Sequence, residues 1–150
     1  MKKIALLMFL AIGFYSCNND DLGTRLNYSI AEITGAELPE SFDSGEIYNI
    51  DVHYELVNAC HNFVSFNFNE FEDPESESTY VIEVAAITSY DANIVECTQE
   101  GELSGMSTIQ NISFNNMNYS TYRFKFLTGY GENEDEQFLI IEVPMQEVEN

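Results

Sequence analysis

The sequence predicts an all-β fold, an antiparallel β-sandwich of about seven or eight short strands. Three observations predict it. Apolar and polar side chains alternate along several short runs, as they do in strands with one buried and one solvated face. Gly, Asn, Asp and Pro separate these runs at short intervals. Beyond residue 16, no run has the spacing of apolar residues that is typical of a helix.

The clearest strand is expected within residues 47–56. Its apolar side chains fall on every second residue and are Tyr48, Ile50, Val52, Tyr54 and Leu56. A helix would not place these side chains on one face, whereas a strand does. The run therefore predicts a strand that buries one face and exposes the other.

The other expected strands are less regular. In chain order they cover residues 25–34, 63–71, 80–87, 94–98, 108–114, 121–126 and 138–143. Residues 80–87 are apolar on both faces, which is typical of a strand at the centre of a sheet. Pro144 is expected to end the last strand, because proline cannot donate to a strand ladder. A jelly roll or a small closed barrel is an alternative with the same pattern.

The first residues resemble a bacterial lipoprotein signal. Lys2 and Lys3 precede residues 4–16, an uncharged and mostly apolar run that is too short to span a bilayer core of roughly 30 Å. A small residue stands directly before Cys17, as in a lipobox, although Phe14 replaces the usual leucine. The alternative is an ordinary cleaved secretory signal.

Residues 18–21, Asn-Asn-Asp-Asp, resemble the acidic export tag of Bacteroidota surface lipoproteins. Segments 39–60 and 122–144 are similar in style to small Bacteroidota lipoproteins with immunoglobulin-like domains. The chain departs from antibody domains because it has no Trp and because Cys60 lies at a strand end. The resemblance implies lipidation of Cys17 and a surface-exposed position at the outer membrane.

This resemblance divides the chain into three parts. Residues 1–16 are the expected signal peptide, residues 17–24 are the lipidated N-terminus and tether, and residues 25–150 form the sandwich domain. Several acyl chains on one cysteine give stable anchoring, whereas a single chain is marginal. The expected partners are accordingly a membrane, contacted through the lipid, and a protein or glycan at the cell surface.

The chain is strongly acidic. It has 26 acidic and 5 basic residues, a formal net charge of −21. Loss of Lys2 and Lys3 with the signal leaves 3 minus 26, or −23. Such a surface repels nucleic acid, so nucleic-acid binding is not expected. The charge indicates either a solvated surface or attraction of cations, calcium in particular.

Two acidic connections are candidate calcium sites, although neither matches an EF-hand loop and solvated loops are the alternative. The candidate ligands are Glu70, Glu72, Asp73, Glu132, Glu134 and Asp135. No other cofactor is expected.

Cys60 and Cys97 remain once Cys17 is assigned to the lipid. Two cysteines in an exported domain predict one disulfide. Two buried free thiols are the alternative.

No catalytic constellation is found, and no catalytic residue is predicted. Gly101 to Gly105 superficially resembles a nucleophile elbow, but Ser104 has the wrong spacing for it. We therefore predict a non-catalytic, lipid-anchored binding protein or accessory subunit. The first alternative is a calcium-assisted glycan-binding module, and the second is a hydrolase with carboxylate chemistry. Arg123 and Lys125 are expected to meet acidic partners across strands, with Glu142 as one candidate.

Overall fold

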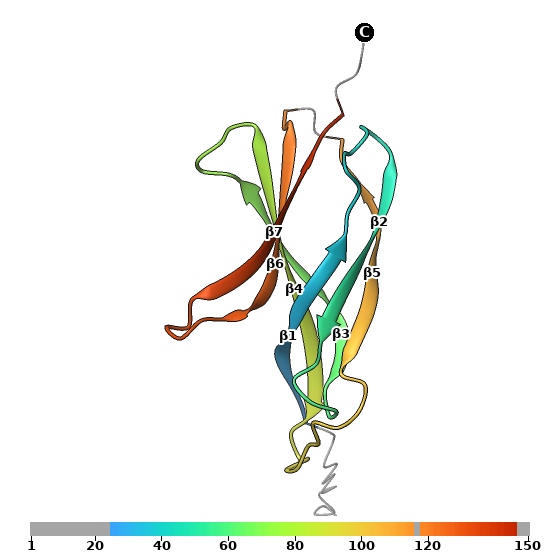
Figure 1. The fold of residues 1–150 in the computed structure, drawn as a ribbon, viewed down its shortest axis with the longest axis vertical. Coiled ribbons are helices and arrows are strands. Elements are labelled where there is room, and N and C mark those ends of the chain that lie inside the picture. Colours follow the sequence, from blue (N-terminus) through green and yellow to red (C-terminus); the bar gives the residue numbers. More distant parts are fainter. Residues whose placement is uncertain (1–24, 116–117, 147–150) are drawn as a thin grey trace, which may run out of the picture.

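A computed structural model describes residues 25–115 and 118–146, and the fold is all-β (Figure 1). Among these residues, no helix is long and apolar enough to cross a membrane. The strands, in chain order, are β1 Leu26–Glu37, β2 Ile47–Glu55, β3 Asn62–Glu72, β4 Thr79–Asp91, β5 Ser104–Ser113, β6 Thr121–Tyr130 and β7 Glu136–Pro144.

The strands form two layers that share β1. Their order is β5-β2-β1-β4-β6-β7, with β3 paired to β4 outside this path. Residues 26–31 of β1 pair with β4, and residues 32–37 pair with β2. The first half of β1 therefore belongs to the layer of β3, β4, β6 and β7, and the second half belongs to the layer of β2 and β5. β5 and β7 end the path, so the sheet is open and the closed-barrel alternative is wrong.

One strand pair departs from the antiparallel expectation. β4 and β6 are parallel, with Thr79 opposite Thr121 and Val84 opposite Phe126. Residues 86–91 of β4 are occupied by β1, so only the first half of this edge is available to β6. The N–H groups of Ser120 and Thr121 both donate to the carbonyl of Ser78, which holds the start of β6 beside the start of β4.

The hydrophobic core lies between the two layers. β2 contributes Ile50 and Val52, which are fully buried, as the alternation in residues 47–56 predicts. β4 contributes Val84, and β6 contributes Phe124 and Phe126. The central position of β4, which contacts β1, β3 and β6, agrees with its apolar character on both faces.

Phe42 closes the core although it lies outside the strands. Its side chain is fully buried, and its ring centroid is 4.0 Å from that of Phe114. Its N–H donates to the carbonyl of Pro144 at 2.9 Å, and its carbonyl accepts from Gln146 at 2.8 Å. The connection from β1 to β2 is thereby held against the end of β7. Pro144 ends β7, as predicted.

The predicted strand at residues 94–98 is wrong. These residues form a loop in which Val95 is 94% exposed and Ile94 is 47% exposed. The loop is joined to the β2–β3 connection by a disulfide between Cys60 and Cys97, whose Cα atoms are 5.7 Å apart. Its apolar residues imitate a strand in sequence, but no neighbouring strand buries them.

The expectation for Arg123 and Lys125 is confirmed, with one change of partner. Arg123 lies opposite Glu142 in the β6–β7 register and donates to it at 2.6 Å. Arg123 also contacts Asp73. Lys125 instead donates to Glu83 of β4 at 2.5 Å, on the parallel side.

Candidate functional site

A hollow of the described surface lies between β3 and β5, an edge strand of each layer. Two adjoining cavities of about 470 Å³ and about 240 Å³ follow one another along these strands. Glu70, Ile82 and Ile112 line both cavities, so the two form one groove. We call it the β3–β5 groove.

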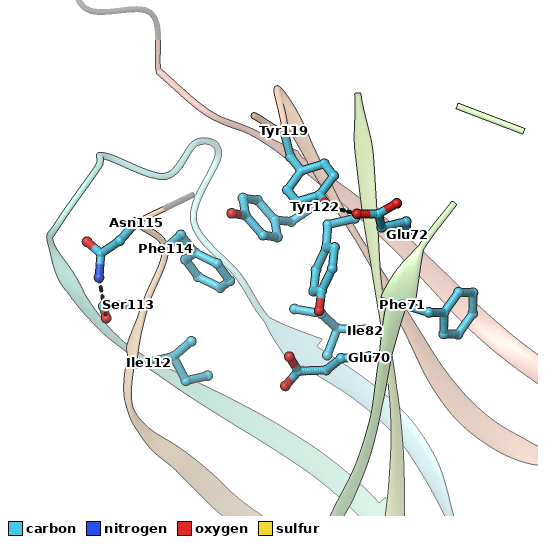
Figure 2. Close-up of a pocket in the computed structure, with 11 residues that line it drawn as sticks. Glu70, Phe71, Glu72, Ile82, Ile112, Ser113, Phe114, Asn115, Tyr119 and Tyr122 are labelled. Carbon is cyan, nitrogen blue, oxygen red and sulfur yellow. Dashed lines mark hydrogen bonds between the residues drawn. The ribbon is translucent and has the colours of Figure 1, made fainter. Parts of the chain in front are cut away.

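The floor of the β3–β5 groove is part of the core. Ile82 of β4 lies beneath both cavities, with Phe124 of β6 under one and Tyr122 of β6 under the other. Figure 2 shows Phe114 and Tyr119 at the end of the groove. The floor is supplied by β4 and β6, which each have strand partners on both sides.

The β5 wall depends on a bulge. Ile109 and Ile112 both line the groove, although residues three apart on a regular strand point to opposite faces. Two residues of β5 lie between the pairs Ile50–Ile109 and Tyr48–Ile112, whereas β2 has one. Asn111 has a φ of 59°, and its N–H donates to the side-chain oxygen of Asn49 at 3.1 Å. This extra residue turns both isoleucines to the same face.

The β3 wall carries two carboxylates. Glu70 and Glu72 pair with Ile82 and Tyr80 of β4 and share the face that lines the groove. Figure 2 shows the Glu70 carboxylate turned into the cavity, whereas Phe71 points away. Among the described residues, none forms a hydrogen bond or ion pair with the Glu70 side chain.

Glu72 has a partner at the end of the groove. The Tyr119 hydroxyl donates to it at 2.6 Å. This hydrogen bond, together with burial, raises the pKa of Tyr119 to about 12. Tyr119 is therefore a protonated donor at physiological pH and leaves Glu72 as the acceptor.

The aromatic side chains of the groove pack mainly on one another. The ring centroids of Phe114 and Tyr122 are 4.4 Å apart, and those of Tyr80 and Tyr119 are 4.9 Å apart. Phe114, Tyr119 and Tyr122 are each buried. Their ring faces are largely used in these contacts, so they form a floor and an end wall instead of a stacking platform.

The candidate calcium ligands fall into three settings. Glu70 and Glu72 line the groove, and Asp73 is buried, accepts from the N–H of Glu75 at 3.0 Å and contacts Arg123. The remaining candidates lie in the β6–β7 hairpin and are Glu132, Glu134 and Asp135. Within residues 25–115 and 118–146, no three His, Cys, Asp or Glu side chains are grouped to hold a metal ion. Calcium binding stays a prediction.

Cys17 lies outside the described residues, so its lipidation also stays a prediction. The predicted pairing of Cys60 with Cys97 is present. Ser104 begins β5 opposite Glu55, in a regular strand pair.

A polar cluster lies near the disulfide. His61 is 8% exposed, and its Nδ1 lies 3.1 Å from the Ser29 hydroxyl and 3.2 Å from the Thr88 hydroxyl. Its ring stacks on Tyr90 with centroids 4.6 Å apart. Burial lowers the pKa of His61, because the charged imidazolium is poorly solvated there.

Comparison with protein-family models, with curated proteins and with solved structures finds no match for the chain. The candidate site therefore rests on geometry. Sequence reasoning missed the groove, because its residues come from β3, β4, β5 and β6. Tyr119 was the available signal, since a tyrosine in a short connection often contacts a partner or closes the end of a sandwich.

Proposed function

We propose that this chain is a non-catalytic binding module of the cell envelope, anchored through Cys17, and that a protein partner lies in the β3–β5 groove. One observation carries the proposal. The groove is open between two edge strands, has an apolar floor and carries on its β3 wall a carboxylate, Glu70, that has no partner among the described residues. Concave apolar surfaces with a few polar groups are the usual form of binding sites.

The placement of the carboxylates supports binding over hydrolysis. Glu70 and Glu72 come from one strand and line the same wall. Glycoside hydrolysis needs two carboxyl groups that flank the scissile bond. The β5 wall contributes Ile109, Ile112 and uncharged polar residues instead.

A protein partner is also favoured over a glycan. Sugars usually bind on exposed aromatic faces, but the rings of Phe114, Tyr119 and Tyr122 are buried against other side chains. Strand edges, in contrast, offer backbone N–H and C=O groups to a polypeptide.

The groove can be tested by photocrosslinking in the producing cells. A photoreactive residue at Gln110, which is exposed and lines the groove, should give an adduct with a defined partner. The same residue at Ile140 of β7, which is 55% exposed and outside the groove, is the matched control. Adding Ile112→Arg to the Gln110 variant should abolish the adduct. The same adducts from both positions, or none from Gln110, would contradict the proposal.

The anchor is tested separately. Cys17→Ser should abolish incorporation of a labelled fatty acid and release the protein from the membrane fraction. Met8→Ser, in the same leader, is the control for a general effect on export. Unchanged labelling of the Cys17→Ser protein would show that the cysteine carries no lipid.

A further inference from the structure

We propose that the groove binds an extended segment of another protein, which adds as a strand to the free edge of β3 and places a Lys or Arg side chain against Glu70. This inference rests on the proposed function and names the class of partner. The segment is placed on the edge of β3 because a bulge interrupts the edge of β5, whereas residues 65–72 of β3 keep a regular register.

The β3 edge is regular along the groove. Residues 65–72 pair with residues 80–87 of β4 without a register shift. In the described part of the chain, no strand pairs with the other side of β3. Alternate residues of an antiparallel strand direct their N–H and C=O groups to each side, so about half of these groups face outward.

The β5 edge is less suitable. Its bulge at Gln110 and Asn111 breaks the ladder, and bulges at sheet edges commonly prevent the addition of another strand. A segment that lies along β3 would instead present its inward side chains to Ile109 and Ile112, across the groove. Every second residue of the segment should therefore be apolar.

The charge of Glu70 determines which residue the bound segment needs at one of its inward positions. Glu70 lies on the inward face of β3 between Phe68 and Glu72, and it has no cationic partner in the described structure. An inward-pointing charge on an edge strand disfavours pairing with apolar or acidic strands. A Lys or Arg side chain satisfies it, because a charge-assisted hydrogen bond replaces the water that the carboxylate loses.

The same charge argues against two other occupants. A second copy of the mature chain would bring 26 acidic and only 3 basic residues, another net charge of −23 (3 minus 26). The chain's own residues 18–21 and 147–150 carry acidic residues and no cation, and neither segment has alternating apolar residues. The occupant is therefore a basic, alternately apolar segment of a different protein.

Synthetic peptides test this inference with the mature full-length chain. The probe is an eight-residue peptide in which Thr alternates with Val and one Lys replaces a Val, scanned over the inward positions. Binding is measured by calorimetry, and its site by amide hydrogen exchange at residues 65–72. Glu70→Gln should weaken binding of the best Lys peptide about tenfold, as expected for one charge-assisted hydrogen bond. Glu132→Gln makes the same charge change in an exposed hairpin and should have no effect.

Two peptide variants test the strand geometry. A Glu in place of the Lys should abolish binding. N-methylation of alternate peptide nitrogens should abolish binding in one of the two registers and spare it in the other, because only one set pairs with β3. The inference would be overturned if the Glu70→Gln and wild-type proteins bound the Lys peptide equally, or if neither set of N-methyl groups weakened binding. It would also be overturned if no Lys peptide bound. Protection of residues 65–72 by oligosaccharides in place of peptides would overturn it in favour of a glycan. A Gln110 adduct in cells would preserve the proposed function in each of these cases.

Discussion

Tyr119 donates its hydroxyl hydrogen to Glu72 at 2.6 Å, although 47 residues separate them in sequence. The bond joins the connection before β6 to the last residue of β3 and holds the Tyr119 ring at the end of the β3–β5 groove. The groove therefore has one closed end, and its shape depends on a contact between two segments that do not pair as strands.

The raised pKa of Tyr119 is directly measurable. Glu72→Gln should lower it from about 12 toward the ordinary value of 10.0, because the hydrogen bond to the carboxylate is the largest cause of the shift. The folded pKa exceeds the unfolded one, so the stability linked to this group is complete below pH 10 and is lost as the pH rises toward 12. Ultraviolet titration of the tyrosines measures the change. Glu77→Gln, in the connection that follows β3, is the control, and identical curves for both variants would contradict the assignment.

The buried His61 predicts an opposite dependence on pH. Its folded pKa is lowered from 6.5, so the unfolded state binds more protons as the pH falls through this value. Stability should be complete above about pH 7.5 and decrease on acidification, until the folded protein also takes up the proton. His61→Asn should flatten the dependence of the melting temperature on pH between about pH 7.5 and pH 5.5, whereas His53→Asn, at a half-exposed position of β2, should not. A slope that persists in the His61→Asn variant would assign it to other groups.

Gly105 is required by the side chain opposite it. It pairs with Tyr54, and a Cβ at this position would lie 2.5 Å from the Tyr54 Cζ atom. Tyr54 cannot easily retreat, since its ring stacks on Phe63 at 4.7 Å. Gly105→Ala should lower the free energy of unfolding by about 1–3 kcal/mol, the usual cost of overpacking. Gly35→Ala, whose Cβ would meet its nearest neighbour at 3.9 Å, should change it by less than about 1 kcal/mol in denaturant titrations.

The disulfide is expected to contribute to stability through the unfolded chain. Cys60 and Cys97 are 37 residues apart. Replacing both with Ser should lower the free energy of unfolding by about 4 kcal/mol on the chain-entropy model. Denaturant titrations with and without reductant measure this. Reductant should destabilise the wild-type protein and leave the double variant unchanged, and an equal response of both would show that the bond does not form in solution.

Much of the fold could be predicted because its signals are local. The strict alternation in residues 47–56 is sufficient to place β2 and its buried face. The partner of Arg123 could be anticipated because two adjacent strands joined by a hairpin have few possible registers. The pairing of Cys60 with Cys97 could be predicted because only these two cysteines remain once Cys17 is assigned to the lipid, in a domain that is expected to be exported.

The remainder depends on contacts between distant segments. Nothing local indicates that β1 changes layers at residue 32, or that β6 joins β4 in parallel. The spacing of Ile109 and Ile112 contradicts a regular strand unless Asn111 is known to adopt a left-handed conformation. Glu72 is the last residue of a strand that lines the groove, whereas the sequence places it in the acidic connection after residue 71.

The direction of β4 would set the orientation of the molecule if Cys17 carries the proposed lipid. Thr79 begins β4 near the closed end of the groove, and Asp91, its last residue, pairs with Leu26. Thirteen residues at about 3.3 Å each separate these ends by roughly 40 Å. A lipid on Cys17, eight residues before Arg25, would hold the end with the exposed Ile94 and Val95 toward the bilayer. The Tyr119 end would then point outward as the distal tip, within reach of molecules arriving from the medium and beyond the lipid headgroups.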